Sequence, residues 1–229
     1  MLVKHTMPYR EKVVRHRKEL RDTIRQAALE EFATRGFDGA STQSIAQRAG
    51  ISKPQLHYYI SSKEELYEEV LEHLIVGWRE IYTVSMSESE PKKIIREYVR
   101  RKIEFGYQNP SAYRLYAIEM ASGAPFLSKR WEPFLENVRR QAKVIQSWVD
   151  NRLIKPVDPV LFQVHLWAIT QHYADFNIQV RALLKLKKDD VLDTEHIIDE
   201  ATTLFLRVCG LADETKPKAV SRRSSAKRS

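Results

Sequence analysis

The sequence predicts an all-α protein, and three observations lead to that prediction. The chain of 229 residues contains only 7 glycines and 9 prolines, so long stretches lack the residues that interrupt helices. Hydrophobic residues make up 43% of the chain, which is enough for a packed core. Apolar side chains recur mostly at the spacing of a helix face rather than in the alternation of a strand. We therefore expect an N-terminal unit of three short helices followed by a larger helical unit.

The first predicted helix covers residues 17–35 and ends at Gly36. Its apolar positions follow the repeat of a buried stripe. They are Leu20, Ile24, Ala27, Ala28 and Phe32. The preceding residues, 1–16, are basic and show no such repeat, so we expect them to form a mobile arm.

Two short helices are predicted between Ser41 and Lys63, with a turn at Gly50 between them. A hydroxyl side chain can cap each helix, because it accepts a hydrogen bond from an unpaired backbone N–H at the helix start. Leu56 and Ile60 point into the core from the second helix, four residues apart. The side chains left on its outer face are Lys53, Gln55, His57, Tyr58 and Tyr59. Such a face suits the major groove of DNA, which admits a helix and distinguishes the four base pairs.

A connecting helix over residues 64–84 follows, then a polar linker over 85–91. The first half of the connecting helix should pack on the N-terminal helices and its second half on the rest of the chain, so that the helix can transmit a movement between the two units. Five further helices are predicted. They span residues 92–108, 111–121, 127–153, 159–186 and 194–211.

The net charge of +8 is concentrated at the two ends of the chain. Residues 1–63 carry an excess of six positive charges, and residues 216–229 carry another six, which leaves the remainder acidic. This division fits a unit that binds DNA joined to one that does not. We expect residues 212–229 to form a disordered basic tail; basic ends can also serve only to keep a protein in solution.

Several classes of protein are disfavoured by the sequence. The single cysteine, Cys209, rules out an intramolecular disulfide and a cysteine-rich zinc site. The N-terminus lacks the apolar run of an export signal, so a cytoplasmic location is expected. The most apolar region, residues 160–180, contains too many polar groups to span a membrane, and no membrane partner is expected.

A string of motifs at fixed spacing runs from Leu20 to Trp78. The motifs are Gly36-Phe37, Ser41-Thr42, Ile45-Ala46, Ala49-Gly50-Ile51-Ser52, Leu56, Tyr58-Tyr59 and Ser62-Lys63-Glu64-Glu65-Leu66. Together they closely resemble the DNA-binding domain of TetR-family transcriptional regulators. About a dozen positions take part, which is far more specific than one short motif. The resemblance implies a helix-turn-helix DNA-binding domain over residues 17–63 and an effector-binding and dimerisation domain over 85–211.

The resemblance also assigns roles to residues of the second short helix and its surroundings. Family members touch base edges where this chain has Lys53, Pro54 and Gln55, and phosphates where it has Thr42, Tyr59 and Lys63. His57 stands where the family usually has tyrosine. Ser52 and Tyr58 complete the expected set of DNA-binding residues. A lysine bound to guanine or a glutamine bound to adenine would each contribute about 1 to 3 kcal/mol of discrimination.

The last two predicted helices, 159–186 and 194–211, carry broad apolar stripes that need partners on more than one side. The resemblance implies that these helices pair with those of a second copy in a four-helix dimer interface. A core formed within one chain is the alternative.

Three residues at helical spacing, Trp167, Gln171 and Asp175, form a candidate effector site, with Trp78 approaching from the connecting helix. Gln171 and Asp175 could instead hydrogen-bond across a dimer. The stretch WAITQHYADF resembles the RutR-like branch of the family, which includes the pyrimidine-utilisation regulator, and so implies a pyrimidine as effector.

Metal binding and catalysis have little support in the sequence. His165, His172 and Asp175 could share a helix face, but satisfied polar residues explain them better than a metal site. The chain lacks a phosphate-binding glycine loop and a nucleophile elbow. We expect no enzyme activity, no cofactor and no metal.

The sequence therefore predicts a homodimeric repressor that binds a near-palindromic DNA operator and is released by a small-molecule effector. Its recognition helices would enter major grooves about 34 to 36 Å apart. A transcriptional activator is one alternative. Another is a nucleoid-style architectural protein without an effector, in which the basic tail would bind DNA of any sequence.

Overall fold

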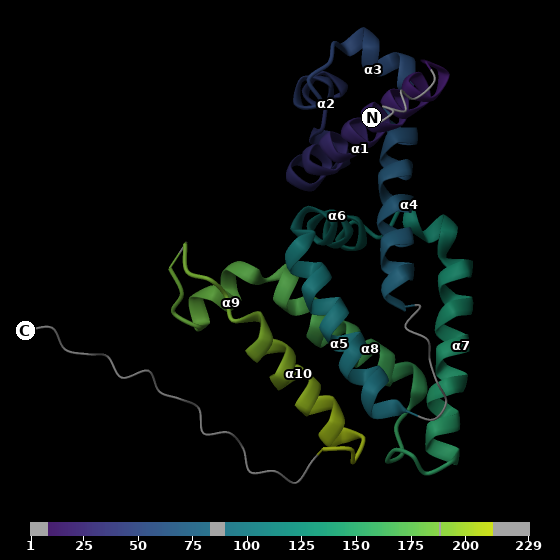
Figure 1. Ribbon diagram of the computed structural model, residues 1–229, viewed down its shortest axis with the longest axis vertical. Coiled ribbons are helices and arrows are strands. Elements are labelled where there is room, and N and C mark those ends of the chain that lie inside the picture. Colours follow the sequence, from purple (N-terminus) through teal and green to yellow (C-terminus); the bar gives the residue numbers. More distant parts are fainter. Residues whose placement is uncertain (1–8, 83–89, 188, 213–229) are drawn as a thin grey trace, which may run out of the picture.

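The computed structural model describes residues 9–82, 90–187 and 189–212, and all regular elements within these ranges are helical. Figure 1 shows a head formed by α1, α2 and α3 at one end, a bundle of further helices at the other, and α4 running between them. The head consists of α1 (Tyr9–Gly39), α2 (Thr42–Arg48), α3 (Lys53–Tyr59) and the first half of α4 (Lys63–Tyr82). The bundle consists of α5 (Pro91–Gln108), α6 (Pro110–Ala121), η1 (Leu127–Arg130), α7 (Trp131–Asp150), α8 (Pro159–Asp175), α9 (Asn177–Leu183) and α10 (Thr194–Val208).

Local capping explains where α2 and α3 begin. The Ser41 hydroxyl accepts a hydrogen bond from the backbone N–H of Ser44 at 3.0 Å. The Ser52 hydroxyl accepts from the N–H of Gln55 at 3.3 Å, and the Gln55 side chain accepts in return from the N–H of Ser52 at 2.9 Å. This reciprocal pair is a capping box. Between the helices Gly50 has a φ of 69°, which an L residue rarely adopts, so the tight turn depends on glycine.

The expected mobile arm over residues 1–16 is wrong for residues 9–16, because α1 begins at Tyr9. Arg10, Glu11, Lys12 and Arg15 are good helix formers, and Arg15 forms an ion pair with Glu19 at 3.1 Å, one turn away. An exposed helix needs no apolar stripe, which is why periodicity did not reveal it. Residues 1–8 lie outside the described part of the chain. The predicted end of this helix at Gly36 corresponds to a kink, where Gly36 has a φ of 67°.

The hydrophobic core of the head is not made by the head alone. It is built around Ile24, Phe32, Ile45, Leu56 and Leu66, all almost fully buried. Leu115 of α6 and, beyond it, Ala124 and Leu127 belong to the same cluster. In Figure 1, α6 lies directly beneath α1, and these two helices pack closely. The head and the bundle therefore share a core.

The bundle is organised around α5, which packs against both α8 and α10, while α7 packs against α8. The predicted helix over 127–153 is instead a 3₁₀ turn followed by α7. Pro133 lacks an N–H, so it fits the first turn of α7 better than the middle of a longer helix. At the other end, Arg152 has a φ of 56°, which ends the helix at Asp150.

The predicted helix over 159–186 is also wrong in its length, because it breaks at Phe176 into α8 and α9. Asp175 and Asn177 flank the break, and both are poor helix formers because their short polar side chains compete for backbone groups. The predicted last helix is shorter than expected and ends at Val208, before Gly210. Residues 85–89 of the expected linker and most of the expected tail, residues 213–229, lie outside the described residues, as do residues 83 and 84 at the end of the predicted connecting helix.

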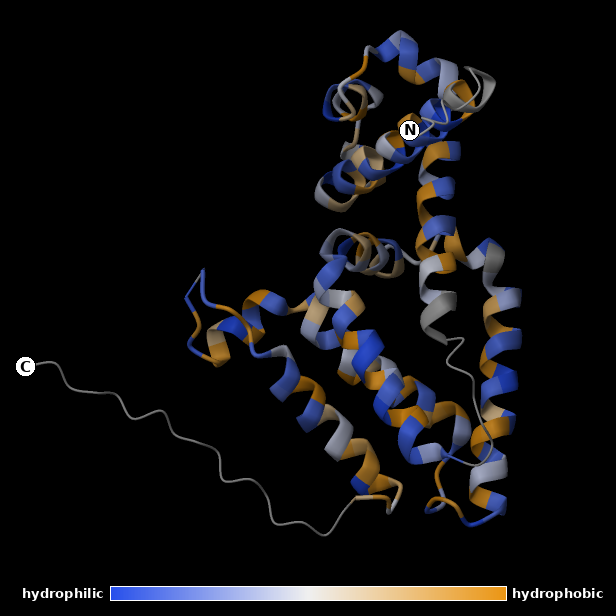
Figure 2. Cartoon of the chain, viewed as in Figure 1, coloured by the Kyte–Doolittle hydropathy of each residue, from blue (hydrophilic) through white to orange (hydrophobic). Residues whose placement is uncertain are grey.

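Apolar residues, orange in Figure 2, run along α8, α9 and α10, and several of them have exposed side chains. Phe162 and Leu166 of α8 are buried in the bundle core, but the other face of α8 is open. The exposed residues include Val160, Leu161, Val164, Ile178, Leu204 and Val208. The prediction that α8 is apolar on two faces is therefore confirmed. Among the described residues, no helix is both long and apolar enough to cross a membrane.

Candidate nucleic-acid interface and small-molecule site

Helix α3 presents a compact polar surface at the tip of the head. The Leu56 side chain of α3 is fully buried, and that of Ile60, just after the helix, is 7% exposed, so these two residues hold the helix on the core. Lys53, Pro54, Gln55 and His57 are exposed, and Tyr58 is 71% exposed. Tyr59 is half-buried and meets Tyr58 edge to face, with ring centroids 5.4 Å apart. The helix therefore offers cationic, amide, imidazole and phenol groups from one face.

Two expected DNA-binding side chains already have partners in the free protein. The Gln55 side chain oxygen accepts from the N–H and the hydroxyl of Ser52, at 2.9 and 3.1 Å. A bidentate contact with adenine would require Gln55 to leave this capping box. The Lys63 ammonium donates to the backbone oxygens of Phe37 and Ala40, at 2.9 and 3.2 Å, and lies 4.4 Å from the Phe37 ring centroid.

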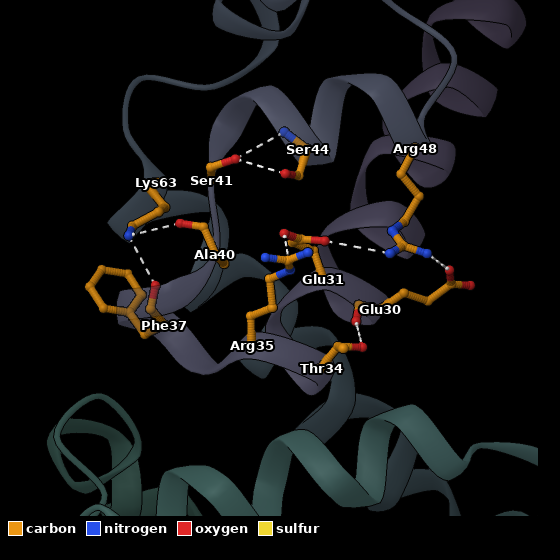
Figure 3. Close-up of polar contacts among 10 residues, drawn as sticks. All are labelled: Glu30, Glu31, Thr34, Arg35, Phe37, Ala40, Ser41, Ser44, Arg48 and Lys63. Carbon is orange, nitrogen blue, oxygen red and sulfur yellow. Dashed lines mark hydrogen bonds and ion pairs between the residues drawn. The ribbon is translucent and has the colours of Figure 1, made fainter.

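Figure 3 shows Lys63 turned inward over the end of α1, away from an open position. The ammonium donates hydrogen bonds to carbonyl oxygens at the end of α1 that have no partner within the helix, so Lys63 holds α4 against α1. The free protein thus gives Lys63 a different environment from the exposed phosphate contact that the sequence predicted.

The same view shows how α2 is held against α1. Arg48 at the end of α2 forms ion pairs with Glu30 at 3.0 Å and Glu31 at 3.4 Å. Glu31 is only 2% exposed and also pairs with Arg35 at 3.3 Å. A buried carboxylate with two cations fixes the spacing of the helices. Thr42, in the first turn of α2, is half-buried.

Arg17 is a further cation at this surface that sequence reasoning missed. Its guanidinium lies 5.6 Å from the centroid of the Tyr58 ring, within the range of a cation–π contact. No sequence signal connected them, since α1 and α3 meet only in the folded head.

A buried carboxylate connects the head to the bundle. Glu119 of α6 is 2% exposed and accepts a hydrogen bond from the Tyr67 hydroxyl of α4 at 2.9 Å. Its other oxygen accepts from the backbone N–H groups of Phe126 and Leu127, at 2.7 and 3.0 Å. Burial and the neighbouring carboxylate raise the pKa of Tyr67 above its ordinary value, so its hydroxyl stays a donor. Glu119 thereby joins α4, α6 and the start of η1.

A second group, of buried and half-buried side chains, lies where α4, α5, α6 and α8 meet; we call it the Trp78 cluster. It comprises Trp78, Lys102, Tyr113, Tyr116 and Asp175. The Trp78 ring centroid is 5.6 Å from that of Tyr113 and 4.5 Å from that of Tyr116. The Lys102 ammonium lies 4.8 Å from the Trp78 ring centroid. Burial lowers the pKa of Lys102 to about 8, against the opposing effect of the Asp175 carboxylate.

The acidic side of the cluster is incompletely satisfied. Burial raises the pKa of Asp175, while a 2.9 Å hydrogen bond from Gln171 to one carboxylate oxygen and the charge of Lys102 act in the opposite direction. The other oxygen, Oδ1, and the indole Nε1 of Trp78 are buried and have no hydrogen-bond partner among the described residues. One acceptor and one donor are therefore left for a molecule that enters the cluster.

The four predicted effector residues do not all meet in one place. Gln171 and Asp175 are bonded to each other, and Trp78 lies beside Lys102. Trp167 instead packs on Phe134 of α7, with ring centroids 5.6 Å apart, and lines a small cavity one turn further along α8. Lys102 was missed as a site residue. A lysine within the apolar stripe of the predicted 92–108 helix was the signal for it.

His165 and His172 do not join Asp175 in a ligand set. In the described parts of the chain, no group of three or more histidine, cysteine, aspartate or glutamate side chains could hold a metal ion. His172 stacks on Phe176, with ring centroids 4.8 Å apart.

The chain matches known families along most of its length. Residues 24–70 match the bacterial regulatory proteins of the tetR family, and residues 71–212 match the C-terminal region of YcdC-like protein. The chain belongs to the TetR family. It is 38% identical to the HTH-type transcriptional regulator RutR of Escherichia coli K12 over 161 residues, which cover 70% of this chain and 76% of RutR.

Solved structures share the fold of this TetR-family chain. SCO4942 from Streptomyces coelicolor superposes with a TM-score of 0.63 at 22% identity, over 82% of this chain and 97% of that one. AibR, in a structure with isovaleryl coenzyme A and operator DNA, superposes with a TM-score of 0.57 at 19% identity, over 79% and 97% of the two chains.

As a member of the TetR family, the chain is a helix-turn-helix regulator of transcription. Its relatives are transcriptional regulators, a family without enzyme activity. The resemblance read from the sequence is thus confirmed at the level of family and fold.

Proposed function

We propose that this TetR-family regulator is a repressor that a small-molecule effector releases from its operator. The observation that carries the proposal is the shared core of head and bundle, with the Glu119 bridge at its centre. A change of shape in the bundle then changes the orientation of α3, which is the differential contact that control by a ligand requires. The regulator would work in the cytoplasm, where its operator DNA lies.

Within the head, we propose direct base contacts from Lys53, Pro54 and Gln55. Ser52, His57 and Tyr58 would contribute further contacts from the same exposed surface. Thr42 and Tyr59 would bind phosphates that flank the groove. Lys63 would bind a phosphate with the third N–H of its ammonium, because the other two donate to the carbonyl oxygens of Phe37 and Ala40. A protonated His57 would bind a phosphate more strongly than a neutral one.

Selection of operator sequences from random DNA, followed by fluorescence anisotropy, tests the head. The protein should bind the selected duplex at least about a thousandfold more tightly than scrambled DNA at physiological salt. A preference below about tenfold would favour an architectural protein. Gln55→Ala should reduce the preference, whereas Thr42→Ala should weaken binding to both duplexes alike. Equal losses on both duplexes for both variants would contradict the division between base and phosphate contacts.

For the bundle, we propose that the effector binds at the Trp78 cluster. This site is formed by the effector-binding domain, residues 85–211, together with the second half of α4. Asp175, Gln171 and the indole N–H of Trp78 would hydrogen-bond to the edge of a planar ligand, while Trp167 lies one turn away, outside this set. A pyrimidine would suit these groups, because its N–H could donate to Asp175 Oδ1 while its carbonyl accepts from Trp78 Nε1. Lys102 and Asp175 balance each other's charge, which favours a neutral ligand.

Uracil and thymine test this assignment in the anisotropy assay. Either should release the wild-type protein from the operator at concentrations below about a millimolar. Asp175→Asn should require at least about tenfold more ligand, because it replaces an acceptor with an amide that can present a donor. If neither uracil nor thymine released the wild-type protein or the variant from the operator, a pyrimidine would be ruled out as the effector. A rise in transcription of the target gene with the unliganded protein would make it an activator.

A further inference from the structure

A small cavity lies between α5, α7 and α8, one helical turn away from the Trp78 cluster. It has a volume of about 20 Å³. Tyr98 on α5 and Trp167 on α8 line it, and each stands four residues before a residue of the neighbouring site, Lys102 and Gln171 respectively. Its walls are otherwise aliphatic or aromatic, with two glutamines, and no charged residue lines it.

Three lining side chains contain a buried polar atom with no hydrogen-bond partner in the described structure. The atoms are Gln141 Nε2, Trp148 Nε1 and Gln163 Oε1. These side chains are only 6%, 1% and 2% exposed, respectively. Native proteins rarely leave such groups unpaired, because an unmet donor or acceptor in the interior is costly.

The orientation of the Gln163 amide is fixed by the backbone around it. Its Nε2 donates to the carbonyl oxygens of Pro159 at 2.9 Å and Val138 at 3.3 Å. Both amide protons therefore have acceptors, and Oε1 remains as an acceptor. Gln141 and Trp148 supply donors from α7. The cavity thus combines two donors and one acceptor without a charge.

We propose that this site, which we call the glutamine cavity, binds a neutral molecule in which a carbonyl stands next to an N–H. Primary amides, lactams, ureas and cyclic imides belong to this class. The ligand carbonyl accepts from Gln141 and Trp148, and its N–H donates to Gln163. A carboxylate fits badly, since its oxygen would face Gln163 Oε1 and no cation lines the cavity to offset its desolvation. The site goes beyond the proposed effector site and does not depend on it.

The volume of the cavity has a further consequence for binding. A water molecule needs about 10 to 15 Å³ and would fit as it stands, whereas an amide requires the cavity to widen. Trp167 is half-buried and leans on Phe134 of α7, which is 37% exposed. We expect this pair to move, because the other lining aromatic rings, Tyr98, Trp148 and Phe162, are enclosed in the bundle core.

The indole N–H signals of the four tryptophans in a ¹H–¹⁵N spectrum report on the cavity directly. The probes are acetamide, 2-pyrrolidinone and uracil, with acetate as the charged counterpart of acetamide. In the full-length dimer, the neutral amides should shift the Trp148 signal saturably, and acetate should not. Trp148→Phe assigns that signal. Gln163→Leu should weaken binding at least about tenfold, since it removes the acceptor.

Gln146→Leu is the control for this change of residue type, because Gln146 lies on α7 with Gln141 and Trp148 but is exposed, and among the described residues its side chain bonds only to Asp150, at 2.8 Å. It should leave the titration unchanged. If Gln163→Leu does not fold, calorimetric titration of Trp148→Phe with 2-pyrrolidinone replaces it, and weaker binding by about threefold or more is expected for the lost donor.

Equal shifts with acetate and acetamide, undiminished binding in both cavity variants, or no saturable shift up to about 50 mM would each overturn the proposal. The last result would mean that the cavity holds water only. Uracil keeps the two sites apart: a shift of the Trp78 signal with release of DNA, but none at Trp148 with any amide, supports the effector site and removes the glutamine cavity. A saturable shift of the Trp148 signal, with no shift of the Trp78 signal and no release of DNA by uracil, would contradict the proposed effector site and support the glutamine cavity.

Discussion

Replacing Tyr67 with phenylalanine tests whether the Glu119 bridge joins head and bundle. The change removes one hydroxyl and keeps the ring, which packs edge to face on Phe32 with centroids 4.8 Å apart. The lost bond is 2.9 Å long and ends on a carboxylate that is 2% exposed. Hydrogen bonds to charged groups contribute about 1.5 to 3 kcal/mol, so the free energy of unfolding should fall by that amount, about 10- to 150-fold in the equilibrium constant.

Urea unfolding measures this loss, and the protein concentration is kept fixed because the apparent stability of a dimer depends on it. Tyr173→Phe serves as the control, because Tyr173 is half-buried on α8 and does not touch the head. Operator binding by Tyr67→Phe should also depend less on the effector, since one of the three bonds to Glu119 is gone. A loss below about 0.5 kcal/mol, with the full effect of the effector on operator affinity, would refute the idea that this bond connects the two parts.

Three other predictions concern single residues. Lys63→Met should lower the free energy of unfolding by about 1 to 3 kcal/mol through its two lost carbonyl contacts, whereas exposed Lys53→Met should leave stability unchanged and weaken operator binding; the opposite pattern would contradict the environments described for them. Because burial lowers the pKa of Lys102 to about 8 from an ordinary 10.5, the unfolded chain binds more protons between these values. Stability should therefore rise with pH there, by at most about 1.4 kcal/mol per unit, and an identical rise in Lys102→Met would exclude Lys102 as its source. Leu204→Asp on the open face of α10 should yield monomers in sedimentation velocity and weaken operator binding strongly; an intact dimer would exclude this face as the interface.

The parts of the fold that depend on neighbours in sequence were predictable. The Ser41 and Ser52 caps and the turn at Gly50 act over three or four residues, so the pattern of residue types places α2 and α3 closely. Helix ends governed by weak local preferences were less accessible. The break at Phe176 and the extension of α1 back to Tyr9 both involve residues whose propensities differ by only fractions of a kcal/mol per residue.

The candidate sites were predictable only where one helix supplies the residues. The exposed face of α3 followed from its periodicity, because Leu56 and Ile60 define the buried side. By contrast, the partners of Lys63 are carbonyl oxygens of another helix, and Glu119 reaches α4 and η1 across the fold. Such contacts depend on tertiary packing, which periodicity within a helix does not report.

The shared core has a practical consequence for building chimeric regulators. A graft that joined another regulator's bundle after Leu71 would remove Leu115, Ala124 and Leu127 from beneath Phe32 and Tyr67. The transplanted head would then expose apolar surface or pack on side chains of the wrong shape. A working sensor made from this head should therefore carry matching residues on α6 and in the loop before η1. The junction of such a chimera has to be designed over the whole interface between head and bundle, and not only at the residue where the two sequences are joined.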